Sequence, residues 1–182
     1  SHSISPAVQN RAFQARREDA VYLPFLVQPA YLKDFMSMAE KLPLAGFSVE
    51  ARVLSRQDYS GGREASLSPT DLALGWGPMA DDAVLARLDI SQSARWYHYA
   101  WAGKAPLPPA EIARSSANMH LIPADATTAA ALRRVRVDER VRIDGWLVEA
   151  KARDGWRWRS SLTREDVGNG ACEVVYVCAI TP

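Results

Sequence analysis

Cysteine and histidine are scarce in this sequence, and their spacing excludes the sites that usually need them. The chain has two cysteines and three histidines. On a straight strand Cys172 and Cys178 would lie about 20 Å apart, whereas a disulfide needs Cα atoms within about 7 Å. We therefore predict no disulfide between them unless the chain folds back. His98 and His120 lack the short spacing of metal ligands, so we predict no metal, and no motif indicates a cofactor.

An excess of one charge and long apolar runs are also lacking. The formal net charge is +1, so no overall field attracts a polyanion such as nucleic acid. No stretch approaches the roughly 18–20 apolar residues that cross a bilayer, and the start of the chain has no signal-peptide pattern. The chain begins at Ser1 without methionine, so an export signal or membrane anchor before it would not be seen in this sequence.

Apolar and charged residues are present in ordinary amounts, 48% and 24%, which indicates a globular protein with a core. A length of 182 residues fits one domain with, at most, one appendage. Residues 1–45 are predicted to be an N-terminal lead-in. Its amphipathic helix covers 31–42, because apolar residues recur there at helical spacing before Pro43. Residues 46–182 are predicted to form a single domain.

Helices and strands are mixed along that domain. Alternating apolar residues predict a strand from Phe47 to Val53. Ser68 and Pro69 predict the start of a short helix that continues through Leu74. The other predicted elements are a helix over 82–88 capped by Asp81, a strand over 94–101, a buried stretch over 119–122, and a helix over 126–135 capped by Asp125.

The clearest pattern lies near the C-terminus. Two alternating stretches joined by a turn at 153–155 predict a β-hairpin over residues 140–162. Gly145 inside its first strand indicates a bend or a close approach of two backbones. A stretch that is apolar on both faces predicts a central strand over 171–180. We therefore predict an α+β fold: a curved antiparallel sheet or a small, partly open β-barrel, OB-like in one version, flanked by short helices.

Four motifs carry a resemblance to a known family. They are ARVLSR at 51–56, GWGPM at 75–79, SSANMHLIPA at 115–124, and SSLTRED at 160–166 followed by GAC at 170–172. They resemble an uncharacterised family of proteobacterial proteins whose members often start with a hydrophobic export or anchor segment. The resemblance covers roughly residues 46–178. It implies a periplasmic domain, or one anchored to the inner membrane and facing the periplasm, with a cytoplasmic location as the alternative. The family has no known activity and implies no catalytic residue.

Three loops carry the candidate ligand-binding residues. Trp76 lies in a glycine-rich turn, where an indole could grip a ligand or simply cover the core. The other two loops offer hydroxyls, an amide and charges, which could hold a carboxylate or phosphate or satisfy nearby backbone groups. We predict that at least two loops lie together, with Arg164 facing solvent and His120 near the floor. The candidates are Trp76, Ser116, Asn118, His120, Ser160, Ser161, Arg164 and Asp166.

One pair of residues could form a catalytic site. Cys172 and His120 could act as nucleophile and base, with Asn118, Asp125 or Asp166 as a third member. The structural alternative is a buried cysteine that behaves as a small hydrophobic residue, together with a histidine satisfied inside an apolar stretch. We favour that alternative and assign no catalytic residue.

The leading hypothesis is a non-enzymatic binding or assembly module of the bacterial cell envelope. Its expected partner is another envelope protein or a small anionic ligand, and it would touch a membrane only through a segment absent from this sequence. One alternative is a nucleic-acid-binding β-barrel, based on the arginines and tryptophans of the C-terminal hairpin. Cross-strand pairs of arginine with carboxylates would account for the same hairpin, which makes nucleic acid the weaker hypothesis. The other alternative is a cysteine hydrolase that uses Cys172 and His120.

Overall fold

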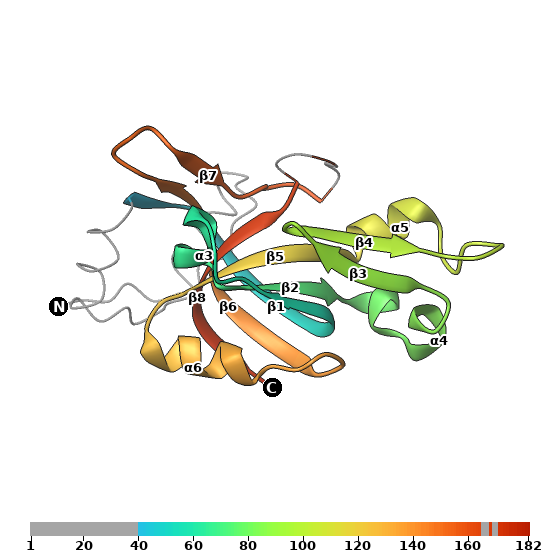
Figure 1. The fold of residues 1–182 in the computed structure, drawn as a ribbon. Helices are drawn as coiled ribbons and strands as arrows, with labels where there is room; N and C mark the ends of the chain where they lie inside the picture. The colour runs from blue at the N-terminus through green and yellow to red at the C-terminus, as the bar shows by residue number, and fades with distance from the viewer. Residues whose placement is uncertain (1–39, 165–167, 169–170) are drawn as a thin grey trace, which may run out of the picture.

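The computed structural model describes residues 40–164, 168 and 171–182. Figure 1 shows a strongly curved sheet, short helices around it, and a two-stranded hairpin that projects to one side. The fold is mixed α+β and mostly strand, as predicted. Its elements are β1 (Glu40–Asp58), α3 (Arg63–Leu67), β2 (Thr70–Gly75), the 3₁₀ turn η1 (Gly77–Ala80), α4 (Asp82–Leu85), β3 (Asp89–Ser93), β4 (Trp96–Ala100), α5 (Pro109–Arg114), β5 (Ser116–Pro123), α6 (Ala126–Arg134), β6 (Arg140–Lys151), β7 (Arg157–Arg159) and β8 (Glu173–Thr181).

The strands of the main sheet pair around a ring. Their order is β1-β2-β5-β8-β6, with the short β7 beyond β6, and β6 also pairs with β1. Every pair is antiparallel except β5 with β8, which run parallel. The prediction of a wholly antiparallel sheet misses this pair, because the partner of β8 in the sheet is not its neighbour in the sequence. Five curved strands, with α6 between the third and the fourth, agree with the OB-like version of the prediction.

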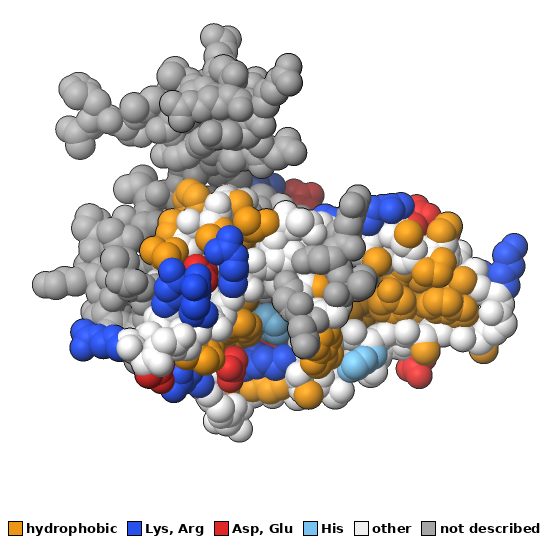
Figure 2. Space-filling model, turned by 90° about the horizontal axis from the view of Figure 1, so that it is seen from above, with side chains coloured by type: hydrophobic (Ala, Val, Ile, Leu, Met, Phe, Trp, Pro, Cys, Tyr) orange, Lys and Arg blue, Asp and Glu red, His pale blue; other side chains and the backbone are white. Residues whose placement is uncertain are grey.

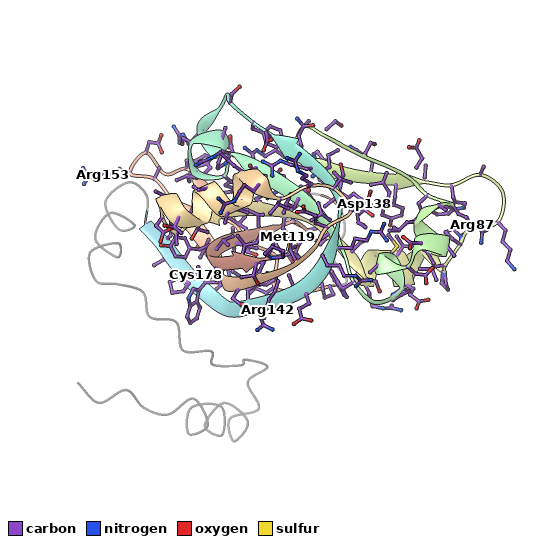
Figure 3. The ribbon with its side chains drawn as sticks, turned by 90° about the horizontal axis from the view of Figure 1, so that it is seen from below. Arg87, Met119, Asp138, Arg142, Arg153 and Cys178 are labelled. Carbon is purple, nitrogen blue, oxygen red and sulfur yellow. The ribbon has the colours of Figure 1, made fainter. Side chains whose placement is uncertain are left out.

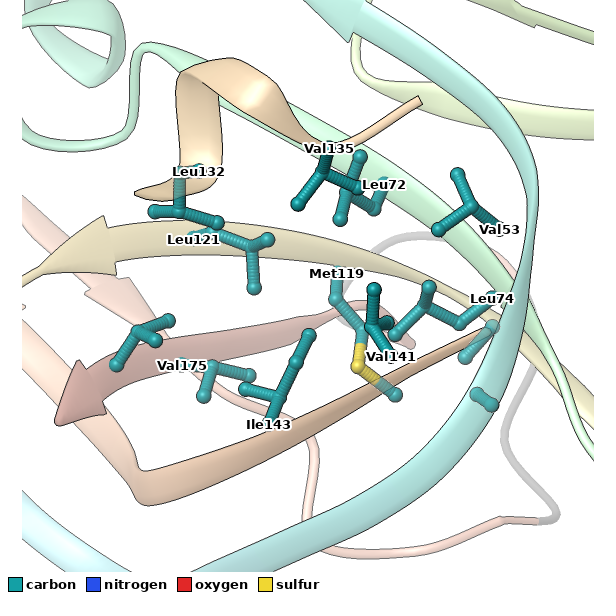
Figure 4. Close-up of a cluster of buried hydrophobic side chains, with 13 residues drawn as sticks. Val53, Leu72, Leu74, Met119, Leu121, Leu132, Val135, Val141, Ile143 and Val175 are labelled. Carbon is teal, nitrogen blue, oxygen red and sulfur yellow. The ribbon is translucent and has the colours of Figure 1, made fainter. Parts of the chain in front are cut away.

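The interior of the ring is a hydrophobic core to which each strand contributes alternate residues. Figure 4 shows core residues from all five strands pointing toward one another: Val53, Leu72, Met119, Ile143 and Val175. Leu132 adds the buried face of α6 to the same core. Figure 3 places Met119 inside the ring and Arg142 on its outer surface.

Gly145 of β6 lies where two backbones approach too closely for a side chain. A Cβ atom on this residue would lie 2.0 Å from the carbonyl oxygen of Tyr176 in β8. The register of β6 against β8 shifts at the same point, between Asp144 and Gly145. The close approach that a glycine inside a long strand predicts is therefore confirmed.

The helix predicted from Ser68 to Leu74 is wrong, because most of this segment belongs to the strand β2. Residues Thr70–Gly75 form a strand that is buried along its whole length and pairs with β1 and β5. Ser68 and Pro69 have the types that start a helix, but burial of both faces favours a strand. The helix lies earlier in the chain, at α3. The helix predicted over 31–42 also needs correction: residues 31–39 lie outside the described residues, and 40–42 belong to β1.

Most other predicted elements are present, with different ends. Asp81 and Asp125 accept backbone hydrogen bonds at the starts of α4 and α6, as their predicted cap roles require. The predicted hairpin is formed by β6 and β7, and the predicted final strand is β8. α5 is not among the predicted elements, although Pro109 suits its first position. None of the helices within the described residues has the length and hydrophobicity needed to span a membrane.

The β3–β4 hairpin lies outside the ring. Its inner side, which includes Tyr97 and Tyr99, packs on a second apolar cluster around Met79. Figure 2 shows hydrophobic side chains gathered on the side of the molecule where the hairpin projects. Its two-residue turn consists of Ala94 and Arg95, whose φ angles are 49° and 68°. Residues other than glycine rarely adopt such angles, so contacts elsewhere must hold this turn.

The two cysteines allow a prediction about reactivity. Neither forms a disulfide within the described residues, as predicted, and burial raises the pKa of the Cys178 thiol to about 11. Because the thiolate is the reactive form, Cys178 should react with iodoacetamide near neutral pH roughly a hundredfold more slowly than an ordinary thiol. The labelling rate of the Cys172→Ala variant, in which Cys178 remains, measures this. A rate close to that of a free cysteine peptide would contradict it.

Candidate binding site

A buried carboxylate lies at the centre of the polar residues that the fold brings together. Asp71 of β2 has 0% of its side chain exposed. Its Oδ1 lies 2.8 Å from Nη1 of Arg95, and its Oδ2 lies 2.9 Å from Nδ1 of His120. Ser68 Oγ and Asn118 Nδ2 are more distant donors, at 3.4 and 3.5 Å. A carboxylate removed from water requires such partners.

The register of the sheet explains how these residues meet. β2 pairs with β5 so that Asp71 lies opposite His120, and Ala73 lies opposite Asn118. Because side chains alternate along a strand, all four point away from the core inside the ring. Leu72, between them, belongs to that core. The polar network therefore lies on the outer face of β2 and β5.

Arg95 reaches this face from the tip of the β3–β4 hairpin. Its Nη2 donates to the carbonyl oxygen of Ser68 at 3.0 Å, in addition to the ion pair with Asp71. Its guanidinium lies over two aromatic rings, 4.0 Å from the centroid of Tyr59 and 5.3 Å from that of Trp158. The backbone of Arg95 is also fixed: its N–H donates to the hydroxyl of Tyr59, and its carbonyl accepts from Asn118. These contacts hold the strained turn.

His120 is almost completely buried between Asp71 and an aromatic ring. Its side chain is 4% exposed, and its ring centroid lies 4.8 Å from that of Trp158. Nδ1 lies within contact distance of Oδ2 of Asp71, but the direction of its N–H does not make a hydrogen bond. His120 therefore lies at the floor of the network and contacts one oxygen of Asp71, while Arg95 donates to the other.

The Trp76 loop contacts the Arg164 loop and lies beside the start of the Ser116–His120 segment, which belongs to the strand β5. The guanidinium of Arg164 lies 5.5 Å from the ring centroid of Trp76, and it pairs with Glu173 at the start of β8. The backbone N–H of Trp76 donates to the carbonyl of Ser115, next to Ser116. Arg164 is 37% exposed. Glu173 lies opposite Met119 of β5, and His120, the next residue, points to the other face of the sheet, so it is not at the floor beneath Arg164.

The remaining predicted site residues satisfy groups nearby. The hydroxyl of Ser116 donates to the carbonyl of Ile112, and that of Ser160 donates to the carbonyl of Ser161 while accepting from the N–H of Val174. Ser161 bonds both backbone groups of Thr163. These bonds are the loop chemistry expected under the structural alternative. Asp166 lies outside the described residues.

The arginines of the C-terminal hairpin surround a buried acid. Arg157 and Arg159 both contact Glu149, which is 4% exposed and belongs to the neighbouring strand β6. Glu149 and Arg159 are direct cross-strand partners. These contacts are the cross-strand pairs that were the alternative to nucleic-acid binding.

Asp71, Arg95, Tyr59 and Trp158 are functional candidates that the sequence pattern did not reveal. The available signal was a single acid, Asp71, inside an otherwise apolar stretch from Thr70 to Gly75. Interpretation of that stretch as a strand would have required a partner for the carboxylate. The identity of the partner could not be deduced, because Arg95 lies 24 residues further along the chain.

An open pocket lies beside the network. It has a volume of about 270 Å³ and lies between the end of β1, the start of β2 and α6. Arg56, Asp58, Tyr59, Thr70 and Arg133 supply its polar groups, and the hydroxyl of Thr70 donates to Asp58. Arg56 is bound to the last carbonyls of α6 and to Asp58, whereas Arg133 forms no ion pair with another described residue. A second pocket, of about 280 Å³, has Arg134 and Glu139 in its wall.

Comparison with known proteins finds a similarity to an enzyme family at the start of the chain. Residues 1–51 match the family model of the shikimate dehydrogenase substrate binding domain. The chain is also 42% identical over 48 residues to the shikimate dehydrogenase (NADP(+)) of Oleidesulfovibrio alaskensis, a match that covers 26% of this chain and 17% of that enzyme. No solved structure matches the chain. In the described part, the matched residues include only the first twelve of β1, 40–51.

This match corrects the functional hypothesis. A non-enzymatic module of the cell envelope was expected, with a nucleic-acid-binding β-barrel and a cysteine hydrolase as alternatives. A substrate-binding domain of a dehydrogenase points instead to an enzyme-related function. The error arose because the family match covers residues 1–51, of which 1–45 were interpreted as a lead-in without a function of their own.

The described residues do not fit NADP(+), the cofactor in the name of this relative. Residues 75–80 have the spacing G-x-G-x-x-A that cradles a dinucleotide, and they follow strand β2. That spacing works at a turn from a parallel strand into a helix, whose N-terminus receives the pyrophosphate. β2 is antiparallel to both neighbours, and Gly77 opens a 3₁₀ turn of four residues. We therefore derive no hydride-transfer step for this part of the chain.

Proposed function

We propose that this chain is part of an enzyme-related protein that binds a small hydroxylated carboxylic acid, the class to which shikimate belongs. The observation that carries the proposal is the match of residues 1–51 to a substrate binding domain. The chain spans less than a fifth of the length of the curated relative that it matches, 17%. We therefore propose only that the chain binds the acid, and not that it carries out the complete dehydrogenase reaction.

The pocket beside the Asp71 network supports this ligand class. Its volume of about 270 Å³ suits a small molecule, and it is rimmed by the Arg133 guanidinium from the last turn of α6. A guanidinium binds a carboxylate through two parallel N–H groups. Thr70 and Tyr59, also in the wall, bring hydroxyls that suit the hydroxyls of a ligand.

Calorimetric titration of the complete chain with shikimate tests the proposal. We expect measurable binding that weakens about tenfold in the Arg133→Ala variant, because a hydrogen bond to a charged group contributes roughly 1.5 kcal/mol or more. Arg134→Ala is the matched control: Arg134 is the next residue of α6, is also exposed, and lies at the other pocket. The methyl ester of shikimate lacks the negative charge. It should bind to the wild-type protein as weakly as shikimate binds to the Arg133→Ala variant.

Two results would count against the proposal. Absence of heat and of any chemical-shift change with shikimate would remove the ligand class. If Arg133→Ala and Arg134→Ala weaken shikimate binding equally, the ligand class would still be supported. The pocket beside the Asp71 network would then not be the binding site.

A further inference from the structure

The side chain of Arg95, 17% exposed, lies among acceptors and aromatic rings from other parts of the protein. One neighbour is the fully buried carboxylate of Asp71, which accepts from Nη1 at 2.8 Å. A second acceptor, the carbonyl oxygen of Ser68, lies 3.0 Å from Nη2. The rings of Tyr59 and Trp158 lie near the guanidinium, at 4.0 and 5.3 Å. We call these four groups the Asp71 cradle.

The cradle has the chemistry of a guanidinium receptor. A guanidinium is planar, presents several N–H donors in one rigid fork, and stacks on aromatic faces. Two acceptors for separate nitrogens and two aromatic rings satisfy both requirements. An ammonium ion has three donors on a single atom and no plane to stack, so it would use only part of the cradle.

The cradle does not depend on Arg95 for its own construction. Asp71 lies in β2, Ser68 ends α3, Tyr59 follows β1, and Trp158 belongs to β7. His120 contacts the second oxygen of Asp71 from β5, so this side of the carboxylate keeps its neighbour when the occupant of the first oxygen changes. Arg95 alone comes from the hairpin outside the ring.

The hairpin that delivers Arg95 is attached under strain. Its turn holds two non-glycine residues, Ala94 and Arg95, at φ 49° and 68°, a region that such residues rarely adopt. An isolated two-stranded hairpin is itself marginally stable. Withdrawal of the tip would relax the turn and leave a desolvated carboxylate with a place for another cation.

We propose that the Asp71 cradle is a binding site for a ligand that carries a guanidinium group, and that Arg95 is its internal occupant. An incoming guanidinium takes the place of Arg95 on Asp71 and Ser68, and the tip of the β3–β4 hairpin leaves the face of β2 and β5. The site is separate from the pocket proposed for the carboxylic acid, although Tyr59 contributes to both.

Removal of the internal occupant tests the proposal on the complete chain. The melting temperature of Arg95→Ala should be lower than that of the wild type. Millimolar methylguanidinium should raise the melting temperature of Arg95→Ala by about 3 °C more than it raises that of the wild type. Methylammonium at the same concentration should give less than half of that rise. If Arg95→Ala is unfolded, the same titration is read as recovery of the near-ultraviolet circular dichroism of the folded protein.

Arg63→Ala is the matched control. Arg63 also pairs with an acid, Asp154, and lies over a tryptophan, Trp156, at 5.5 Å, but its side chain is 47% exposed. Methylguanidinium should not stabilise this variant beyond its effect on the wild type. Equal responses of the two variants, equal responses to the two cations, or no response of Arg95→Ala would each overturn the proposal.

Discussion

Replacement of Gly145 by alanine should destabilise the domain by about 3 kcal/mol or more, because overpacking that moves backbone lies at the upper end of such effects. The new Cβ would lie 2.0 Å from the carbonyl oxygen of Tyr176 and 3.0 Å from its carbonyl carbon. Both are backbone atoms of β8, so no side chain can turn away to make room. β6 pairs with β1, β7 and β8, and its displacement would disturb the whole ring. Thermal denaturation should show a melting temperature lower by about 10 °C.

Gly61→Ala is the control for this effect. No atom lies within 4 Å of a Cβ placed on Gly61, and its loop is exposed. Alanine there should be neutral or stabilising by up to about 1 kcal/mol, because it restricts the unfolded chain. A Gly145→Ala protein that melts within a degree or two of Gly61→Ala would mean that β6 and β8 do not approach each other in solution as they do here.

The parts of the fold that the sequence predicted are those decided by neighbours along the chain. β6 and β7 follow from strict alternation and a turn of suitable residues, and the caps Asp81 and Asp125 follow from their own side chains. Gly145 could be interpreted because a glycine weakens the interior of a strand and is usually kept there for a bend or a close backbone approach.

β2 and the β3–β4 turn could not be predicted from the sequence, because contacts distant along the chain decide them. β2 is buried on both faces, so it shows no alternation, and Ser68 and Pro69 before it imitate the start of a helix. The turn at Ala94 and Arg95 lacks the glycine or asparagine that normally marks two residues of positive φ. Contacts distant in sequence stabilise both elements, and a local pattern cannot report them.

The candidate site shows the same limit. His120 and Asn118 were recognised as unusual polar residues in an apolar stretch, and both lie in the network around Asp71. Arg95 was not among the candidate residues, since nothing near it in the sequence indicates a buried acid. Its role follows from the order β2-β5 and from the return of the hairpin over that face.

The Asp71→Ala variant should show the largest effect of any substitution in the network. It leaves Arg95 and His120 without the carboxylate that both contact, and breaking a buried ion pair by removing one partner costs about 3–5 kcal/mol. The loss should be visible as a melting temperature about 10 °C lower and as a smaller urea concentration at the midpoint of unfolding. Asp154→Ala, which removes the acid of the exposed pair with Arg63, should cost at most about 1 kcal/mol.

The double variant Asp71→Ala with Arg95→Ala separates the charge effect from the loss of packing. Because the two residues share one contact, their combined destabilisation should be smaller than the sum of the single values by more than about 0.5 kcal/mol. Removal of Arg95 also releases the strained turn, which lowers the cost of the second substitution further. Additive values would show that Asp71 and Arg95 do not depend on each other. In that case the carboxylate would owe its place to His120 alone, and the hairpin tip would rest on Tyr59 and Trp158 through its aromatic contacts.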